Sequence, residues 1–223
     1  MKVCVIIPTY NEASTIAGIV TKIKQLGLEI LVIDDGSLDN TSQIARDNGA
    51  VILRNENNEG KGASLIKGFR YALNSGSEAV ITMDGDGQHL PEEIPYFIRI
   101  AKDSKSGILI GNRMLRNNSM PLVRVMTNKF MSWIISLVAG QDIPDTQCGF
   151  RLIKKDVLEN VNLRTSKYES ESEILIKASR LGYKIESVPI KTIYSGEKSQ
   201  INPLIDTLRF IKFIINEAWT TRD

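Results

Sequence analysis

The sequence predicts an α/β fold, with a mostly parallel central sheet flanked by helices. Two observations carry this prediction. Short apolar runs alternate four times with amphipathic stretches in the first half of the chain, which is typical of strands joined by crossover helices. The runs are apolar at nearly every position, as strands of a parallel sheet covered on both faces are. We therefore expect helices on both faces and right-handed connections.

The first two strands are predicted at residues 3–7 and 29–33, each a continuous run of apolar side chains. Between them, isoleucine and valine recur at helical spacing over residues 16–23, and Gly27 ends that helix. After the second strand, the polar segment Asp-Asn-Thr-Ser opens a helix at about 41–48. This stretch therefore predicts a strand, a helix, a second strand and a second helix.

The third and fourth strands are predicted at 50–53 and 78–83. A polar loop at 55–62 leads into a helix at 63–74 that connects them. The fourth strand ends abruptly in the segment Asp84-Gly-Asp-Gly-Gln-His89. We expect the functional site to be organised around this strand end.

The rest of the chain is less regular. A proline and two glutamates open the next helix, as is common in a first helical turn. The predicted elements are helices at 91–104, 121–139, 168–181 and 203–219, and strands at 107–110, 150–153 and 184–190. Polar loops occupy 140–149 and 194–202. There is no internal repeat and no domain linker, so we expect one domain for residues 1–223.

The composition is that of a soluble globular protein, with 42% hydrophobic and 24% charged residues among 223. A net charge of +2 gives no reason to expect a nucleic-acid partner. Cys4 and Cys148 show no C-x-x-C spacing, so neither a disulfide framework nor a zinc site is expected, and Cys4 reads as a buried thiol. The apolar part of residues 1–8 is too short for a signal peptide. Because no run of about 18 apolar residues occurs, we expect no spanning helix and a cytoplasmic protein.

Polar and charged residues follow the predicted strands at four places, 8–12, 34–37, 84–88 and 111–113. The carboxyl ends of the strands form the edge at which open α/β sheets bind ligands. Turns alone would require polar residues and glycines there, but not so many acids and an arginine. The sequence therefore predicts a ligand site along this edge.

The densest of these segments contains Asp84 and Asp86, each followed by a glycine. The glycines let backbone or ligand come close. Asp86, Gln88 and His89 offer ligands suited to a hard divalent cation, and such a cation commonly also holds substrate phosphates. A polar turn that merely caps a strand and a helix is the alternative.

Five segments resemble the family-2 glycosyltransferases: Ile7-Pro-Thr-Tyr-Asn-Glu12, Val32-Ile-Asp-Asp-Gly-Ser37, Asn58-Glu-Gly-Lys-Gly62, Met83-Asp-Gly-Asp-Gly-Gln-His89 and Gly111-Asn-Arg113. Within that family the sequence is similar to dolichyl-phosphate mannose synthases and related polyprenyl-phosphate glycosyltransferases, from residue 1 to about 210. The resemblance implies a Rossmann-like domain of the GT-A type. It further implies a nucleotide-sugar-binding half at 1–113 and an acceptor-binding half, with the C-terminal helix, at 114–223.

The resemblance also implies a nucleotide-diphosphosugar donor and a divalent metal ion, Mn²⁺ or Mg²⁺. The positions that match base and ribose contacts are Pro8, Tyr10, Glu12, Ile33 and Asp35. The Asp-x-Asp motif is matched by Asp84, Gly85 and Asp86, with Asp86 and Gln88 on the metal. Lys61 and Lys198 are added as donor-binding cations, although the full Walker pattern around Lys61 is missing.

On the acceptor side, Arg113 matches an arginine at the diphosphate and the acceptor phosphate. Arg124 and Asn128 fall where the dolichyl-phosphate enzymes hold the acceptor phosphate. On the residues alone, Arg124 also fits a solvated arginine of an amphipathic helix. Gly196-Glu-Lys-Ser199 resembles a mobile loop that closes over the donor, but its last two residues are in the opposite order, and the arginine that precedes this loop in the synthases is replaced.

The candidate catalytic residues are Asp84, Asp86, Arg113, Asp145 and Glu173. Asp145 begins a segment that resembles the family's Asp-x-x-x-Gly-Phe, and Glu173 matches its inward-facing glutamate. Each has a plainer interpretation: Asp145 as a turn residue, and Glu173 as a buried hydrogen-bonding acid or a solvent-facing one. His89, the single histidine, fits a structural residue better than a base.

Sugar transfer requires that the charge of the departing nucleoside diphosphate be neutralised, by the cation as a Lewis acid and by Arg113 and Lys198. The acceptor then attacks from the opposite face and inverts the anomeric centre. A phosphate acceptor is already anionic and needs no general base. An alcohol would need a carboxylate or imidazole, for which Asp145, Glu173 and His89 are the candidates.

Four functions remain open: transfer from a GDP- or UDP-sugar to polyprenyl phosphate, transfer to a glycan, lipid or protein hydroxyl, a sugar-nucleotide pyrophosphorylase, and a non-catalytic binding module. The pyrophosphorylase loop does not follow the first strand, and Asp84, Asp86 and Arg113 argue against a non-catalytic module. Basic residues beside Trp and Phe in 121–139 predict contact with a membrane surface or the acceptor. We therefore expect a peripheral membrane contact or a membrane-protein partner, whereas 203–219 is expected to pack on the sheet.

Overall fold

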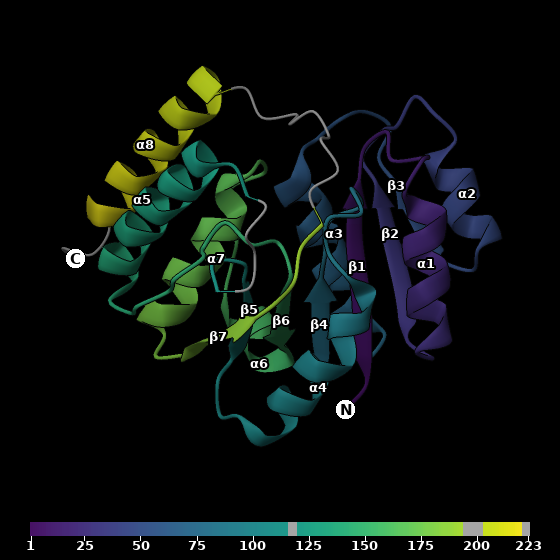
Figure 1. The fold of residues 1–223 in the computed structure, drawn as a ribbon, viewed down its shortest axis with the longest axis horizontal. Helices are drawn as coiled ribbons and strands as arrows, with labels where there is room; N and C mark the ends of the chain where they lie inside the picture. The colour runs from purple at the N-terminus through teal and green to yellow at the C-terminus, as the bar shows by residue number, and fades with distance from the viewer. Residues whose placement is uncertain (116–119, 194–202, 220–223) are drawn as a thin grey trace.

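The computed structural model describes residues 1–115, 120–193 and 203–219, which form one sheet covered by helices (Figure 1). The strands are β1 Val3–Thr9, β2 Glu29–Asp34, β3 Val51–Arg54, β4 Ala79–Thr82, β5 Ile108–Asn112, β6 Arg151–Lys154 and β7 Ile185–Pro189. The helices are α1 Ile16–Gln25, α2 Thr41–Asp47, α3 Lys61–Asn74, α4 Ile94–Asp103, α5 Leu122–Ala139, α6 Lys155–Asn160, α7 Glu169–Arg180 and α8 Pro203–Trp219, with a 3-10 turn, η1, at Pro91–Glu93. The predicted α/β class is confirmed.

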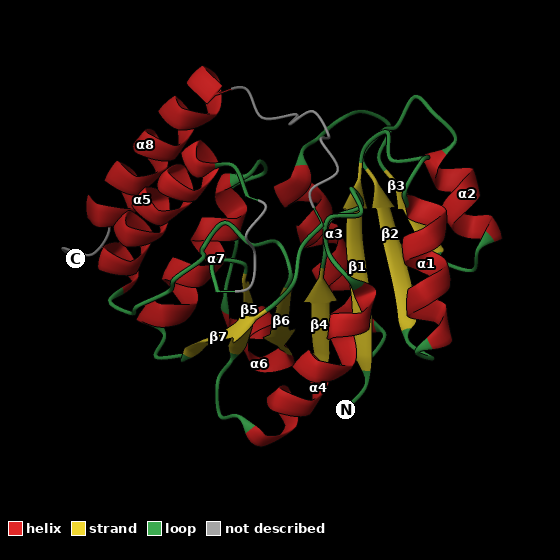
Figure 2. Ribbon diagram, viewed as in Figure 1, coloured by secondary structure: helices red, strands yellow, loops and turns green. Residues whose placement is uncertain are grey.

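The sheet is mostly parallel, in the order β3-β2-β1-β4-β6-β5-β7 (Figure 2). β1 pairs in parallel with β2 and β4, β2 with β3, and β5 with β7. β6 runs antiparallel to both of its neighbours, β4 and β5. The alternation of strands and helices predicts the parallel pairs but not this antiparallel insertion. The connection from β5 to β6 passes through α5, which packs on α7 and α8, and it begins and ends at the same edge of the sheet.

The sheet has helices on both faces. In Figure 1, α1 and α4 lie on the near side of the sheet and α3 lies behind it. α3 fits closely against β1: a methyl group added at Gly68 would come within 2.7 Å of Ile6 Cγ2. The central strands are buried as the continuous apolar runs predict, with Cys4 to Ile7 fully enclosed. This core fixes where each strand ends.

Several boundaries differ from the prediction. The helix predicted at 91–104 begins as the 3-10 turn η1 before α4. The six residues of α6 directly follow β6 and are not predicted, because so short a helix contains too few residues for a helical period to show. α8 packs mainly on α5 and α7, and not on the sheet as expected. These differences leave the sheet edge that carries the predicted site unchanged.

α5 presents an apolar face outward. Its large apolar side chains expose between 59% (Trp133) and 79% (Leu122) of their surface, and the members of this apolar face of α5 are Leu122, Val123, Met126, Phe130, Trp133 and Leu137. With 18 residues and a mean hydropathy of 1.2, α5 is long and apolar enough to cross a membrane by length and composition, and 17% of it is buried. By these two criteria α5 is a candidate spanning helix, which the expectation of no spanning helix did not include.

The antiparallel direction of β6 brings a new segment to the predicted site. β1, β2, β4 and β5 all end at one edge of the sheet. Because β6 runs the opposite way, it begins at that edge, with Arg151 paired to Thr82 of β4 and to Ile110 of β5. The loop that precedes β6, residues 145–150, therefore lies among the strand ends.

Candidate functional site

The ends of β1 and β2 carry the residues assigned to base and ribose. Pro8, Tyr10 and Glu12 are all partly exposed. Asp35 is buried, and its carboxylate accepts hydrogen bonds from Asn55 Nδ2 at 2.7 Å and from the backbone N–H groups of Glu59 and Gly60 at 2.9 and 2.7 Å. Asp35 therefore fixes the polar loop that leads into α3.

Ile33 differs from the other residues assigned to the donor. Its side chain is fully buried in the core, and its carbonyl accepts a hydrogen bond from Thr9 Oγ1 at 3.3 Å. Ile33 thus lies near the end of β2, but its side chain is in the hydrophobic core.

The turn 84–88 packs directly on the end of β1. Thr15 Oγ1 donates to the carbonyl of Gly85 at 2.5 Å. A methyl group at Gly85 would lie 2.7 Å from Thr9 Cγ2, so a larger residue would push the two segments apart. Glycine at this position therefore lets the Asp-x-Asp turn approach the residues assigned to the nucleotide.

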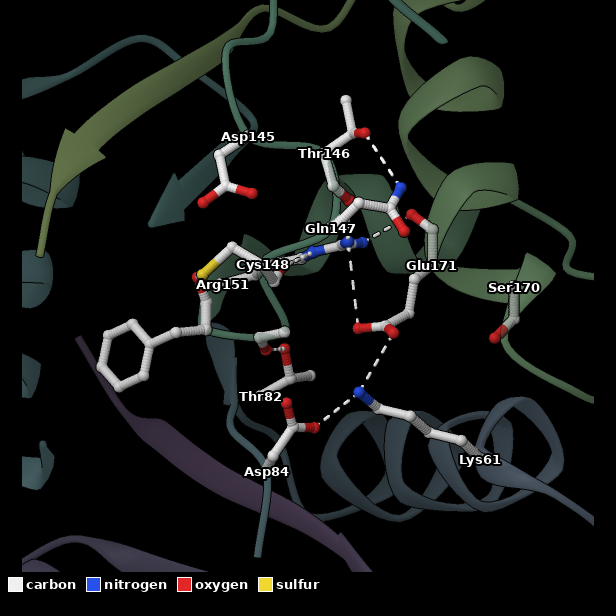
Figure 3. A network of polar contacts seen from close by, with 12 residues as sticks. Lys61, Thr82, Asp84, Asp145, Thr146, Gln147, Cys148, Arg151, Ser170 and Glu171 are labelled. Atoms are coloured by element: carbon white, nitrogen blue, oxygen red, sulfur yellow. Dashed lines mark hydrogen bonds and ion pairs between the residues drawn. The ribbon is translucent and has the colours of Figure 1, made fainter. Parts of the chain in front are cut away.

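Asp84 is partly exposed and lies at one end of a largely buried network of charges (Figure 3). Lys61 Nζ is 2.5 Å from Asp84 Oδ1 and 3.0 Å from Glu171 Oε2. Burial alone would raise the pKa of Asp84, but the Lys61 charge and hydrogen bond, with His89 and Arg113, lower it below its usual value. Burial would likewise lower the pKa of Lys61, but the two carboxylates raise it above its usual value. Asp84 is therefore ionised and Lys61 is charged at neutral pH.

The Asp84 carboxylate also rests against Gly149, in the loop before β6. A methyl group at Gly149 would come within 2.6 Å of Asp84 Oδ2 and 3.0 Å of Oδ1. The backbone of that loop is held by Thr82 Oγ1, which donates to the Gly149 carbonyl at 2.8 Å. The backbone of loop 145–150 therefore packs directly against the Asp84 carboxylate on one side.

Asp86 and Gln88, the residues assigned to the metal, lie in the same turn. The backbone N–H of Gln88 donates to Asp86 Oδ1 at 2.9 Å, and the Gln88 carbonyl accepts from the N–H of Ile193 at 3.0 Å. Both side chains are partly exposed. Among the described residues no three His, Cys, Asp or Glu side chains are grouped closely enough to enclose a metal ion. A carboxylate and an amide oxygen fit Mg²⁺ or Mn²⁺, which commonly complete their coordination with substrate phosphate and water.

His89 is buried behind this turn. Its Nδ1 is 3.9 Å from Asp84 Oδ2. Its ring packs edge-on against that of Phe150, with the two ring centroids 5.6 Å apart. Burial lowers the pKa of His89 to about 4, with Arg113 and Lys61 acting in the same direction and Asp84 opposing them. The ring is therefore neutral at pH 7, and its enclosure agrees with the interpretation of His89 as a structural residue.

Arg113 and Asp145 form a bidentate ion pair. Arg113 Nε and Nη2 donate to Asp145 Oδ2 and Oδ1, each at 2.8 Å, and the backbone N–H of Arg113 donates to Oδ2 at 3.0 Å. Asp145 is fully buried and the Arg113 side chain is 10% exposed. Both carboxylate oxygens are thus engaged by one arginine, so Asp145 holds Arg113 at the end of β5.

Glu173 contacts none of the charged residues of this network and has partners of its own. It is buried, and its carboxylate accepts from the backbone N–H groups of Arg164 and Thr165, from Thr165 Oγ1 and from Lys177 Nζ. Burial alone would raise the pKa of Glu173, but the hydrogen bonds from Lys177, Thr165 and Arg164 lower it. Glu173 thus fixes the segment before α7, as the plainer interpretation of this residue supposes.

The remaining assigned residues lie on α5 or beyond the described part of the chain. Asn128 is buried on the inner side of α5 and Arg124, one turn earlier, is partly exposed. Lys198 and the segment 196–199 lie outside the described residues.

Two residues of the network carry no assignment from the sequence, Glu171 and Arg151. Arg151 is 2% exposed and donates to the carbonyls of Cys148, Thr146 and Glu171 at 2.8, 2.9 and 2.6 Å. The signal available in the sequence is an arginine inside an apolar strand, which must be paired if it is buried.

Comparison with known proteins identifies one family of similar sequences. A sequence profile described as Glycosyl transferase family 2 matches residues 4–161. The chain is 33% identical over 214 residues to a UDP-N-acetylglucosamine–dolichyl-phosphate N-acetylglucosaminyltransferase of Methanococcus voltae, covering 85% of each chain. It is 34% identical over 190 residues to a dolichol-phosphate mannosyltransferase of Pyrococcus furiosus, covering 79% of this chain and 53% of that one.

Among solved structures, the fold is similar to that of glucosyl-3-phosphoglycerate synthase from Mycobacterium tuberculosis in complex with Mn²⁺, UDP-glucose and phosphoglyceric acid. The TM-score is 0.76 at 18% identity, covering 97% of this chain and 79% of that one. At this identity the similarity concerns the fold, and it confirms the predicted GT-A-like arrangement.

Proposed function

This chain belongs to glycosyl transferase family 2 and is a glycosyltransferase; we propose that it transfers a sugar from a nucleotide-diphosphosugar to a polyprenyl phosphate. The donor is a GDP- or UDP-sugar, and transfer inverts the anomeric centre. Relatives over most of the chain are named for dolichyl, dolichol and undecaprenyl phosphate, which supports this class of acceptor.

The observation that carries the choice of acceptor is the state of the three candidate bases. His89 is buried behind the turn 84–88, with 3% of its surface exposed. Both oxygens of Asp145 accept hydrogen bonds from Arg113. Both oxygens of Glu173 accept hydrogen bonds from the segment 164–165. An alcohol must lose a proton to a positioned base during attack, whereas a phosphate oxygen is already a nucleophile. These contacts therefore favour an anionic acceptor.

In this proposal the acidic and the basic residues of the site have different roles. Asp86 and Gln88 would hold the divalent cation, which supplies Lewis-acid neutralisation of the leaving diphosphate. Arg113, which Asp145 orients at the end of β5, would donate hydrogen bonds to the phosphate groups. Donors that are already oriented stabilise the charge of the transition state without having to move during the reaction. Asp84 stays ionised beside Lys61 and would accept hydrogen bonds from hydroxyl groups of the donor.

A lipid acceptor also accounts for the apolar face of α5. Six large apolar side chains point outward there, and Ile211 and Ile215 of α8 extend the surface. Lys129 on α5 and Lys212 on α8 are exposed on the same pair of helices. An apolar helical face with neighbouring lysines is suited to lie at the surface of an anionic bilayer. We propose that this face docks on the membrane in which the acceptor resides.

The function is tested by a transfer assay. The purified protein is incubated with GDP-mannose, UDP-glucose or UDP-N-acetylglucosamine and Mn²⁺, with and without a short-chain polyprenyl phosphate. The expected result is lipid-dependent release of one nucleoside diphosphate that is lost in EDTA and in Asp86→Ala. Donor binding without turnover on the lipid would reject the phosphate acceptor and direct the search to hydroxyl acceptors. Release that persists unchanged in EDTA would reject the metal.

Membrane docking is tested by sedimentation with vesicles of phosphatidylcholine and phosphatidylglycerol. The double variant Phe130→Ser and Trp133→Ser is expected to lower vesicle binding about tenfold, because two exposed aromatic side chains no longer enter the interface. Leu181→Ser removes an exposed apolar side chain outside this face and serves as the control. Equal binding of the double variant and the control would contradict docking through α5.

A further inference from the structure

Four charged side chains of alternating sign form a continuous row that begins at Asp84 (Figure 3). Asp84 contacts Lys61, Lys61 contacts Glu171 at 3.0 Å, and Glu171 Oε1 lies 3.8 Å from Arg151 Nη2. The exposed fractions of these side chains are 28% for Asp84, 16% for Lys61, 15% for Glu171 and 2% for Arg151. The row therefore lies largely out of water, where charges interact strongly.

The row joins elements that are far apart in the sequence. Lys61 stands in the first turn of α3, and Glu171 stands in the first turn of α7. These two helix starts are in contact: the N–H of Ala63 donates to the Ser166 carbonyl at 3.0 Å, and a methyl group at Gly62 would lie 2.6 Å from Ser170 Oγ. These contacts set the spacing of the two helix starts from which the side chains of Lys61 and Glu171 project.

These contacts determine the position of the Asp84 carboxylate. The Lys61 ammonium group is shared by the carboxylates of Asp84 and Glu171, so both of them determine where it lies. Glu171 is itself anchored, because its backbone carbonyl accepts a 2.6 Å hydrogen bond from the buried Arg151. On its other side, Asp84 is limited by the backbone of Gly149. Glu171 thus belongs to the set of contacts that decides where the Asp84 carboxylate stands.

We propose that Glu171 is a positioning residue for the transfer reaction, which acts through Lys61 to hold the Asp84 carboxylate where the nucleotide-sugar meets it. The proposal rests on the proposed function, because Asp84 is taken to face the donor. It gives Lys61 the role of a fixed counter-ion shared between the donor-binding strand β4 and the acceptor-side helix α7. Without the charge of Glu171, Lys61 is drawn onto Asp84 alone and competes with the donor for the same oxygen.

The test is a set of binding measurements with full-length protein, Mn²⁺ and the nucleotide-sugar that the wild type prefers. Glu171→Gln is expected to weaken donor binding about tenfold, the loss of one charge-assisted contact. Glu169→Gln, in the same first turn of α7, is the matched control and is expected within twofold of wild type. Lys61→Met is expected to weaken binding, and adding Glu171→Gln to it is expected to cause no further loss.

The outcomes separate the two proposals. A wild type that binds no nucleotide-sugar contradicts the proposed function and, with it, the role of Glu171. If the wild type binds and Glu171→Gln binds within twofold of it, Glu171 has no positioning role. If the losses in Lys61→Met and Glu171→Gln multiply in the double variant, Glu171 does not act through Lys61. Should Glu171→Gln fail to fold, Glu171→Asp takes its place; it keeps the charge at a shorter reach and must weaken binding more than Glu169→Asp.

Discussion

Replacing Asp145 with asparagine is expected to lower sugar transfer at least about a hundredfold, even with a phosphate acceptor. The asparagine can accept one hydrogen bond from Arg113, but its amide nitrogen faces a guanidinium N–H that now lacks an acceptor. Arg113 is then free to turn, and a misplacement of about 1 Å in a positioning group costs roughly a hundredfold in rate. Breaking a buried ion pair on one side should also lower the free energy of unfolding by about 3 kcal/mol.

The measurements are the rate of nucleotide release with polyprenyl phosphate and the midpoint of thermal unfolding. Asp142→Asn, an exposed acid in the same loop, is the control and should change neither. A role for Asp145 as a general base predicts a different pattern, since a base matters for a hydroxyl acceptor and not for a phosphate. Full activity of Asp145→Asn on the lipid phosphate would therefore exclude the positioning role described above.

Replacing Gly149 with alanine is expected to abolish most transfer while leaving the fold intact. The added methyl group would stand 2.6 Å from Asp84 Oδ2, and Gly149 does not have the positive φ that would itself strain an alanine. The atoms that can yield are the ends of the Asp84 side chain, so the carboxylate moves and the backbone stays. We expect about a hundredfold loss of transfer, by the same sensitivity of rate to position.

Gly18→Ala provides the comparison, because a methyl group at Gly18 in α1 meets no atom within 4 Å. That substitution should retain full activity and stabilise the protein by about 0.5–1 kcal/mol, the difference in helix propensity between the two residues. Circular dichroism would show whether Gly149→Ala retains the native helix content. A Gly149→Ala protein with transfer within fivefold of wild type would show that the position of Asp84 does not govern the reaction.

The sequence predicted the edge of the sheet correctly, because continuous apolar runs followed by polar turns mark both the strands and their carboxyl ends. It could not predict the direction of β6, since a buried strand shows the same apolar run whichever way it points. For this reason Asp145 could be recognised as a candidate, whereas its pairing with Arg113, the residue that follows β5, required the topology.

The three glutamates of α7 show a second limit. Glu169, Glu171 and Glu173 read as an acid-rich helix start, and successive residues of a helix point about 100° apart. Glu171 and Glu173 therefore face different neighbours, Lys61 in one case and the segment 164–165 in the other. Nothing in the local pattern distinguishes them, because the partners come from other elements. The resemblance selected Glu173, and the structure adds Glu171.

The position of β6 also sets the order in which the sheet can close as the chain is synthesised. β5 pairs with β6 and β7, both of which follow it in the chain, and β4 also pairs with β6. Until residue 154 has left the ribosome, β4 and β5 both carry unpaired edges, and such edges readily associate with other chains. Pairings between strands this distant in sequence also form slowly. We therefore expect a nascent chain that ends at residue 113 to be prone to association until β6 and β7 are available to pair.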